Sequence, residues 1–410
     1  MPGRINSIAL KAAVLCSALG IAVGAQAAPT VSDGVVKIGV LTDLSGPFSD
    51  WSGNGSVVAT KMAVEDAGSQ VLGKPVQVVS ADHQNKTDIG LGIARKWYEQ
   101  EKVDAIFDIS NSSVALAVMG LTKEKDKIVV LGGVSTPRVT GDACTPNSIQ
   151  YIYDANALSN VVGKALTQQG GNSWYFITVD FAFGLGLEKA TSEVVEKSGA
   201  KVLGSVRHPL NTTDFSQYLL KAQASGAKVI GLANAGTDTI NAIKGSNEFG
   251  IAAGGKQRVA SLLTFITDVQ SMGLEQAQGL ILSTPFYWDN DDESRKFSKR
   301  FFEKTKRMPT MVQAGMYSAV RHYLQSIAAS GTDDTKIVMA KMKSTPVNDF
   351  FARNGHIRAD GLHVHDMYLM QVKKPAESKA PWDYYRHVAT VSAANAFSPM
   401  AANSACASAK

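Results

Sequence analysis

Small clusters of hydroxyl and amide side chains follow several apolar runs of the sequence, and their chemistry suits the binding of a small anion. Residues 110–113 form one cluster at the expected start of a helix, and a second cluster follows the run 127–133. One polar residue is enough to cap a helix, whereas several beside free N–H groups and a positive helix dipole favour an anion. Helix capping and an ordinary turn are the alternatives. The candidate ligand-binding residues of the two clusters are Asn111, Ser112, Ser113, Ser135 and Thr136.

Large aromatic side chains in connecting segments form a second set of candidates. Trp51 lies in the loop after the run 35–43, where it either caps the core or faces a ligand. Phe183 stands at the expected start of a helix, where it is too bulky for a phosphate site and would serve as an apolar wall. Further candidates at later strand ends are Asn234, Asp238, Leu263, Tyr287 and Trp288.

Motifs of nucleophilic, nucleotide-dependent and metal-dependent catalysis are not recognisable. The sequence has no G-x-S-x-G, P-loop, H-E-x-x-H or C-x-x-C pattern, and Gly184-x-Gly186 lacks the third glycine of a dinucleotide fingerprint. His363 and His365 share one face of an expected strand and could hold a metal, but we expect them at the surface. We therefore predict a protein that is not an enzyme and carries no cofactor and no metal.

The N-terminal residues indicate export from the cytoplasm. Arg4 and Lys11 are followed by small and apolar residues over 12–25, and the segment ends in a small-x-small pattern at 25–27. This arrangement predicts that residues 1–28 are a signal peptide and that the mature protein is periplasmic. Its removal takes away two cations and no acid, which lowers the formal net charge from +5 to +3. Without a long basic run, a nucleic-acid partner is not expected.

The remaining composition is that of an ordinary globular protein. Of 410 residues, 45% are hydrophobic and 19% are charged, and the length favours two domains. No later segment has 18 uninterrupted apolar residues, so we expect the mature chain to be soluble. Cys144 and Cys406 remain after cleavage, and in an oxidising compartment they either form one disulfide or stay as two thiols.

Short apolar runs alternate with amphipathic helical segments along most of the chain. Several of these runs are continuously apolar, as strands buried on both faces of a parallel sheet must be. Strand–helix–strand repetition predicts parallel sheets, and two series of strands fit two α/β lobes better than one sheet. The expected strands are 35–43, 76–82, 103–110 and 127–133, then 173–180, 201–208, 228–235, 258–265 and 279–286.

The last third of the chain has a different pattern. Residues 291–344 are expected to be mostly helical. The segments 363–374 and 384–392 alternate with a period of two and predict a hairpin-like pair of strands. The small, polar tail after them is expected to be ordered only if Cys406 is tied down.

Several stretches resemble the periplasmic solute-binding proteins of the leucine/isoleucine/valine type, which feed ABC importers. They are "IGVLTDLSGPFSDWSGNGSVVATKMAVEDA", "DAIFDISNSSVALAV", "IVVLGGVST" and "VDFAFGLGLEKATSEVVEKSGAKVLG". The resemblance implies the type I periplasmic binding fold, with two Rossmann-like lobes joined by three crossovers and a ligand in the cleft between them. It places lobe 1 at 30–154 plus 288–365, and lobe 2 at 155–287 plus 366–410, which includes the C-terminal hairpin and tail.

The resemblance also implies roles for individual residues. Trp51 falls where the family places an aromatic ring against the ligand, and Phe183 falls at the aromatic position of lobe 2. Ser112 with Asn111 and Ser113, and Ser135 with Thr136, fall where the family grips a carboxylate. Tyr287 or Trp288 falls near the second crossover.

One departure from the family bears on the ligand. Amino-acid binders of this type place an acid after the strand 258–265 to hold the ligand ammonium, and this sequence has Leu262, Leu263 and Thr264 there. A buried ammonium without a counter-charge is costly, so amino acids are disfavoured unless Asp180 or Asp238 substitutes. The prediction is a monomeric importer component that binds a small carboxylate with an apolar or aromatic body and delivers it to a membrane permease. The alternatives are a branched-chain or other amino-acid binding protein, and a ligand-sensing module of the same fold.

Overall fold

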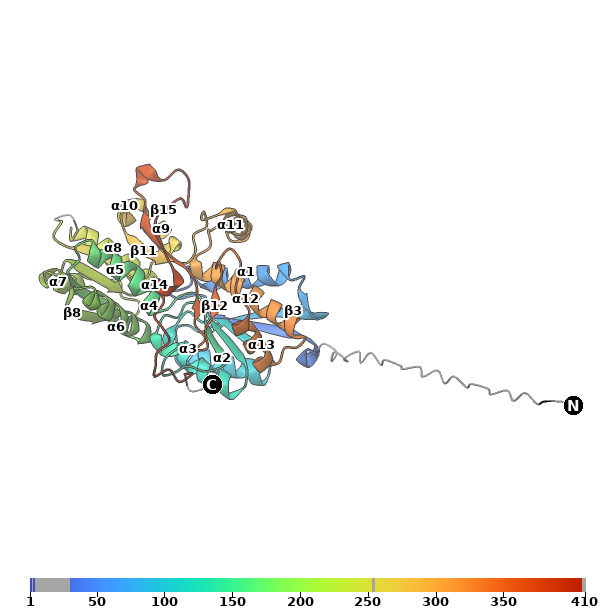
Figure 1. Ribbon diagram of the computed structural model, residues 1–410. Helices are drawn as coiled ribbons and strands as arrows, with labels where there is room; N and C mark the ends of the chain where they lie inside the picture. Colours follow the sequence, from blue (N-terminus) through green and yellow to red (C-terminus); the bar gives the residue numbers. More distant parts are fainter. Residues whose placement is uncertain (2, 4–29, 253–254, 408–410) are drawn as a thin grey trace.

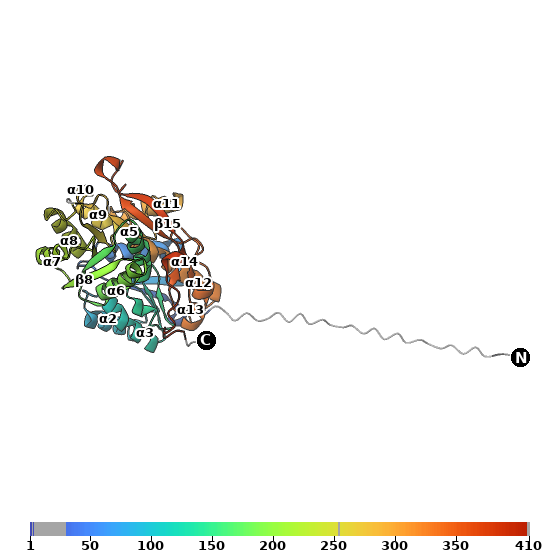
Figure 2. The same ribbon diagram turned by 60° about the vertical axis from the view of Figure 1, so that its left-hand side comes forward.

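The computed structural model describes residue 1, residue 3, and residues 30–252 and 255–407 (Figures 1 and 2). Nearly all of the predicted signal peptide lies outside these residues. Among the helices described, none is long and apolar enough to cross a bilayer. Figure 1 places α1, α12 and α13 towards one end of the molecule, and α6, α7 and α8 with β8 towards the other.

The first sheet has six strands in the order β2-β3-β1-β4-β5-β6. All neighbours are parallel except the short β2, which is antiparallel to β3. Alternate residues enter different cores: Phe107 packs with α1 and α12, whereas Ile106 packs with α2 and α3. The strands are β1 (Val36–Thr42), β2 (Gln70–Val71), β3 (Lys74–Asp82), β4 (Ala105–Asp108), β5 (Ile128–Leu131) and β6 (Ser148–Gln150). The helices on this side are α1 (Gly53–Asp66), α2 (Thr87–Glu99), α3 (Ser112–Glu124), α11 (Asp292–Thr305), α12 (Met311–Ser330) and α13 (Thr335–Ser344).

The second sheet has four parallel strands in the order β10-β9-β7-β8. Its strands are β7 (Ser173–Val179), β8 (Lys201–His208), β9 (Val229–Ala233) and β10 (Arg258–Ser261). The helices along this part of the chain are α4 (Ala155–Leu158), α5 (Lys164–Gln168), α6 (Ala182–Lys197), α7 (Ser216–Ala224), α8 (Thr237–Glu248), α9 (Ile266–Met272) and α10 (Leu274–Ala277). A π-helical turn, Ser159–Gly163, joins α4 to α5. Two parallel α/β units therefore confirm the predicted fold class.

A smaller antiparallel sheet holds the strands that do not fit the parallel pattern. β14 (Met367–Val372) and β15 (Tyr385–Val391) pair antiparallel, which confirms the predicted hairpin. β11 (Ile281–Thr284) pairs with β14 and not with β10, so its expected place in the second parallel series is wrong. An apolar run predicts a strand, but the partner of that strand lies about 90 residues away and leaves no local signal.

The two histidines of "HVH" are buried, and their predicted surface position is wrong. β13 (His363–Val364) pairs with β12 (His356–Ile357) and lies beside the segment that leaves the first sheet after β6. His363 Nδ1 lies 2.9 Å from the Tyr151 carbonyl oxygen, and His365 Nε2 lies 3.0 Å from that of Ile152. The two imidazoles therefore connect the segment 363–365 to the segment 151–152. Burial lowers the pKa of both.

The C-terminal tail packs beside the first sheet, whereas the sequence predicted that it belongs to lobe 2. After α14 (Ala393–Ala396), the Arg358 guanidinium donates to the Ser398 carbonyl oxygen at 2.7 Å. The Ala405 N–H then donates to the Gly141 carbonyl oxygen at 3.0 Å, and Cys406 forms a disulfide with Cys144. The structure thus has the disulfide rather than two thiols, and the bond ties the tail to the loop after β5.

Candidate functional site

Loops at the carboxyl ends of the two sheets meet, which is where open α/β sheets bind ligands. Trp51, in the loop after β1, stacks on Phe265, in the loop after β10, with ring centroids 4.5 Å apart and planes 9° apart. Gly236 follows β9, and a Cβ added there would lie 2.5 Å from the Pro47 carbonyl oxygen. Its backbone φ of 62° also favours glycine. The two sides are therefore in direct contact around Trp51.

A carboxylate shapes the loop that carries Trp51. The two oxygens of Asp43 accept N–H hydrogen bonds from Gly46 at 2.7 Å and Phe48 at 2.9 Å, which closes the Gly-Pro turn. Thr310 Oγ1 donates to the Trp51 carbonyl oxygen at 2.6 Å. The indole is 1% exposed, and its Nε1 has no hydrogen-bond partner among the described residues. The loop thus holds a large ring in place while leaving its donor unused.

The loop after β4 is strained and then capped. Asp108 and Ile109 have φ of 80° and 52°, a region that side chains with a Cβ rarely adopt. The Asn111 side-chain oxygen then accepts from Ser113 N at 2.9 Å and Val114 N at 3.2 Å, so Asn111 is the N-cap of α3. With the cap supplied by Asn111, the Oγ of buried Ser112 is left without a partner.

Two further unpartnered hydroxyls follow β5 and β6. Ser135 Oγ is buried and unpartnered, while its carbonyl oxygen accepts from Ala155 N at 2.9 Å. Thr136, also buried, is the N-cap of the 3-10 turn Pro137–Val139 without a side-chain bond. Tyr153 OH is buried and unpartnered as well, and burial together with nearby Asp108 and Asp268 raises the pKa of its phenol.

We call Trp51, Ser112, Ser135 and Tyr153 the polar cluster. Their free atoms lie just beyond the carboxyl ends of β1, β4, β5 and β6, which are neighbours in the first sheet. Buried polar atoms are nearly always hydrogen-bonded in native proteins, and one left unpaired costs about 1–3 kcal/mol. Four such groups in adjacent loops indicate a place where a ligand or water completes the bonding. Sequence reasoning missed Tyr153. The available signal was its position in "YIYD", directly after a short strand.

The two predicted polar residues of the second side differ in their hydrogen bonding. The Asn234 Nδ2 lies 3.2 Å from His208 Nε2, and its Oδ1 accepts from Thr239 Oγ1 at 2.7 Å, so both ends of the amide are bonded within the second side. Asp238 is also buried, but neither of its carboxylate oxygens has a hydrogen-bond partner among the described residues. Burial raises its pKa to about 7, although the nearby N–H groups of Asn211 and Thr212 act to lower it. Asn234 therefore supports the loops of the second sheet, whereas Asp238 adds an unpartnered acid on this side.

The predicted apolar residues of the second side are buried near the meeting point. Phe183, at the start of α6, packs on Phe181 with ring centroids 5.8 Å apart. Leu263 is buried in the same hydrophobic core as Trp51 and Phe265. Phe265 was not predicted, although it ends the expected strand 258–265 as its only aromatic residue.

Tyr287 and Trp288 are directed to the antiparallel hairpin. Trp288 Nε1 donates to the Trp382 carbonyl oxygen at 2.8 Å, and Tyr287 OH donates to the same oxygen at 3.3 Å. Tyr287 also borders a small hollow next to Phe265. The structure brings Tyr287 to the edge of the site and gives Trp288 a partner elsewhere.

A buried acid follows β10 after all, four residues beyond Thr264. Asp268 lies in the first turn of α9, and its Oδ2 accepts the Phe265 N–H at 2.9 Å. Burial raises its pKa to about 7, and nearby Asp50 adds to the increase. Asp180, one of the substitutes considered from the sequence, is exposed and lies 3.7 Å from Arg207. Sequence reasoning missed Asp268 because it considered only residues 262–264 as the position of the acid.

A cavity of about 800 Å³ opens between the two sides next to Thr136. Its walls are the turn after Thr136, one face of α6, and Ala401 and Asn403 of the tail. Within the described residues, no group of three or more His, Cys, Asp or Glu side chains could hold a metal ion. Of the predicted site residues only Thr136 lines this cavity, and neither the polar cluster nor Phe265 borders it.

Comparison with known proteins places the chain in a family. A family model described as periplasmic binding protein matches residues 35–379. A periplasmic binding protein from Burkholderia mallei is 48% identical with a TM-score of 0.88, and the match covers 91% of this chain and 99% of that one. A branched-chain amino acid ABC transporter periplasmic ligand-binding protein from Burkholderia xenovorans is 41% identical with a TM-score of 0.80, over 89% and 97% of the two chains.

A more distant structure shares the fold. It is a solute-binding protein of an ABC transporter from Rhodopseudomonas palustris, solved with p-hydroxybenzoic acid. It is 23% identical, with a TM-score of 0.79 and coverage of 88% of this chain and 97% of that one.

Proposed function

Because the chain belongs to the periplasmic binding protein family, we propose that its polar cluster holds the carboxylate of a small solute. The family and its similar structures make the chain a solute-binding protein of an ABC transporter. It therefore acts outside the cytoplasm and serves a membrane permease. The identity of the solute is the part that we propose.

The observation that carries this proposal is the chemistry of the unpartnered atoms. Ser112, Ser135 and Tyr153 offer hydroxyl donors, and Trp51 offers an indole N–H. A carboxylate accepts several hydrogen bonds at once, and bonds to a charged acceptor are stronger than neutral ones. Ser112 is also the first residue of α3, a helix of 13 residues whose positive end favours an anion.

The walls of the site favour an apolar or aromatic body on that carboxylate. Phe265 and Leu263 are buried on the second side, and Phe183 stands at the start of α6. Small-molecule sites are mostly apolar with a few placed polar groups. We propose that lobe 1 (30–154 plus 288–365) grips the carboxylate and that lobe 2 (155–287 with the hairpin) closes over the body by hinge motion.

A specific observation supports a second candidate, an α-amino acid. Asp268 is a buried acid next to Phe265, and a ligand ammonium would both keep it ionised and provide its counter-charge. The similar protein from Burkholderia xenovorans is described as a branched-chain amino acid binder. Asp268 thus weakens the sequence-based argument against amino acids, and the experiment must separate the two classes.

Thermal-shift titration of the wild type and of Asp268→Asn separates them. Asn keeps an oxygen to accept the Phe265 N–H and removes the charge. If the ligand is an aromatic acid, 4-hydroxybenzoate raises the Tm of both proteins equally and leucine raises neither. Stabilisation of the wild type by leucine, lost in Asp268→Asn, would instead establish the amino-acid candidate.

A matched pair of serine variants tests the polar cluster itself. Ser112 and Ser283 are both buried and both have an unpartnered Oγ, but Ser283 lies in β11, away from the cluster. We expect Ser112→Ala to weaken binding of the active ligand about tenfold, the value of about 1.4 kcal/mol. Ser283→Ala should leave the Kd unchanged in isothermal titration. Equal effects of the two variants would remove the cluster from the site.

A further inference from the structure

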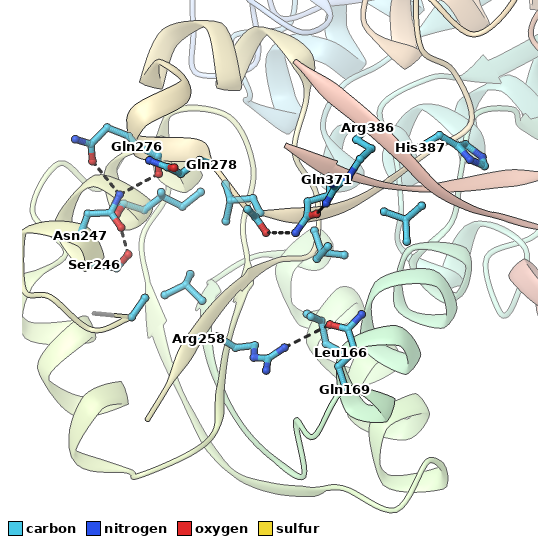
Figure 3. Close-up of a pocket in the computed structure, with 17 residues that line it drawn as sticks. Leu166, Gln169, Ser246, Asn247, Arg258, Gln276, Gln278, Gln371, Arg386 and His387 are labelled. Atoms are coloured by element: carbon cyan, nitrogen blue, oxygen red, sulfur yellow. Dashed lines mark hydrogen bonds between the residues drawn. The ribbon is translucent and has the colours of Figure 1, made fainter. Parts of the chain in front are cut away.

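Another hollow, separate from the cavity beside Thr136, lies at the edge of the second sheet. None of its lining residues belongs to the candidate site. It has a volume of about 520 Å³, within the usual range for small-molecule sites of about 300–1,000 Å³. Figure 3 shows that its walls come from α5, α8, the strands β10 and β11, and the hairpin β14–β15. The proposed solute site does not explain this hollow.

The charged residues that line the hollow are all basic. They are Arg258 and Arg386, joined by His387, and the other polar side chains are mostly amides, without one Asp or Glu in the lining. Among the described residues Arg258 has no carboxylate partner, and its side-chain hydrogen bond is a long one, 3.5 Å to Gln169 Oε1 (Figure 3). Arg386 is 3.8 Å from Glu377, which stands outside the lining. The hollow therefore has a positive charge that an anion would balance.

Two backbone N–H groups at the facing strand edges add to this character. The N–H groups of Arg258 and Leu262 donate to β9, so by alternation the Val259 N–H points to the opposite edge of β10. Directly before β11, the Leu280 carbonyl oxygen accepts the N–H of Val372, the last residue of β14. Hydrogen-bonded and non-hydrogen-bonded positions alternate in an antiparallel pair, so the N–H of the next residue, Ile281, points away from β14. The two N–H groups therefore face away from β9 and β14, the strands with which β10 and β11 pair.

The spacing of the two strands decides the kind of occupant. Cα atoms of β10 and β11 approach within 8 Å, whereas a strand inserted between them needs about 9.6 Å, twice the usual strand spacing. A peptide therefore cannot complete the sheet there. The apolar lining includes Leu166, Ile243 and Val388, the last of which is 44% exposed. These side chains suit the hydrocarbon part of a small molecule.

We propose that this hollow is a second binding site, for an amphipathic organic acid. The Arg258 guanidinium and the Val259 and Ile281 N–H groups hold its carboxylate, and its hydrocarbon body lies on Leu166, Ile243 and Val388. This site is separate from the proposed solute site and does not depend on the solute's identity.

Octanoate is a suitable probe, with 1-octanol as its uncharged counterpart. Methyl-labelled full mature chain is titrated with each below its aggregation limit and followed by methyl NMR. We expect octanoate to shift the methyl signals of Leu166, Ile243 and Val388 and leave those of Leu263 in place, and octanol to shift them at least tenfold more weakly. Equal response to octanol, or octanoate shifts confined to Leu263, would overturn the proposal.

Variants of two exposed basic residues complete the test. Arg258→Gln should raise the octanoate Kd at least tenfold, since it removes the unpaired guanidinium. Lys201→Gln is the control, because Lys201 is exposed on β8, the opposite edge of the same sheet. It should change the Kd less than twofold. If both variants weaken octanoate binding equally, the binding reflects general charge attraction, and the site is rejected.

Discussion

The two sides of the candidate site bond their polar groups within the protein to different extents. On the first side, Ser112 and Ser135 are buried with unpartnered hydroxyls. On the second, Asn234 is bonded to Thr239, and Thr264 Oγ1 donates to Ser261 Oγ at 2.5 Å. Thr178, Asp238 and Thr267 are exceptions on the second side, with buried oxygens that have no partner. Under the proposed function, the first side holds the carboxylate of the ligand, and the second side contributes the apolar walls together with the buried acids Asp238 and Asp268.

The largest effect is expected where the two sides touch. Trp51→Ala removes an indole that is 1% exposed and stacked on Phe265. Truncation of a buried Phe or Trp costs about 3–5 kcal/mol, so the free energy of unfolding in urea should fall by that amount. Ligand binding should be lost as well, because the ring belongs to both the core and the site.

A double-mutant cycle with Phe265→Ala then measures the contact between the sides. A stacked aromatic pair contributes about 0.5–1.5 kcal/mol beyond its buried area. The cycle should therefore give a coupling free energy of that size. A coupling near zero would mean that each ring is held by its own side and that the stack does not link them.

The next effect concerns pH, since both sides contain buried carboxyl groups. Burial raises the pKa of Asp108 on the first side to about 6 and that of Asp268 on the second to about 7. In the unfolded chain both titrate near 3.9. Between these values only the folded protein keeps the proton, so each acid destabilises the fold progressively as pH rises through the window. Every pKa unit is worth about 1.4 kcal/mol.

Asp268→Asn should therefore be more stable than the wild type at pH 8, and the difference should shrink towards pH 4. Asp108→Asn should show the same trend with a smaller amplitude, and Asn also tolerates the φ of 80° at this position. Chemical denaturation at several pH values measures both. The buried histidines contribute equally to wild type and variants, so they cancel in the difference. A difference independent of pH would show that the two carboxyls are not destabilised by burial.

A smaller effect separates an unpartnered hydroxyl from a partnered one. Ser135→Ala removes a buried Oγ that has no bond to lose, so stability without ligand should stay within about 0.5 kcal/mol while the ligand Kd rises. Thr239→Val breaks the 2.7 Å bond to Asn234 and leaves the amide oxygen unpaired, which should cost about 1–3 kcal/mol of stability. Its Kd should hardly change. The opposite pattern would reverse the roles of the two sides.

Much of the fold could be predicted from the sequence because its signals are local. All nine expected strands occur, since short apolar or alternating runs between helical segments are a local signal for a strand. The strand partners of β11 and the path of the tail could not be predicted, because they depend on contacts between residues far apart in the chain.

The candidate site was predictable in position but not in detail. The clusters after β4 and β5 lie where the sequence placed them, and Trp51 lies at the meeting point of the two sides. The identity of the free hydroxyl depends on which residue caps α3. The Asn111 side chain accepts the first N–H hydrogen bonds of this helix, so the Ser112 hydroxyl has no partner. Tyr153 and Asp268 carry no motif, and only three-dimensional packing reveals that they are buried near each other.

The smallest effect is expected at Trp288, which the sequence placed beside the ligand together with Tyr287. Its indole N–H donates to the Trp382 carbonyl oxygen at 2.8 Å, so the side chain supports the hairpin. Trp288→Phe should lower stability by only about 1 kcal/mol, the value of one hydrogen bond. The ligand Kd, measured by isothermal titration, should stay within twofold of the wild-type value. A tenfold weaker Kd would return Trp288 to the site and would mean that the second side contributes more than a cover, because a residue tied to the hairpin would then contact the ligand once it is bound.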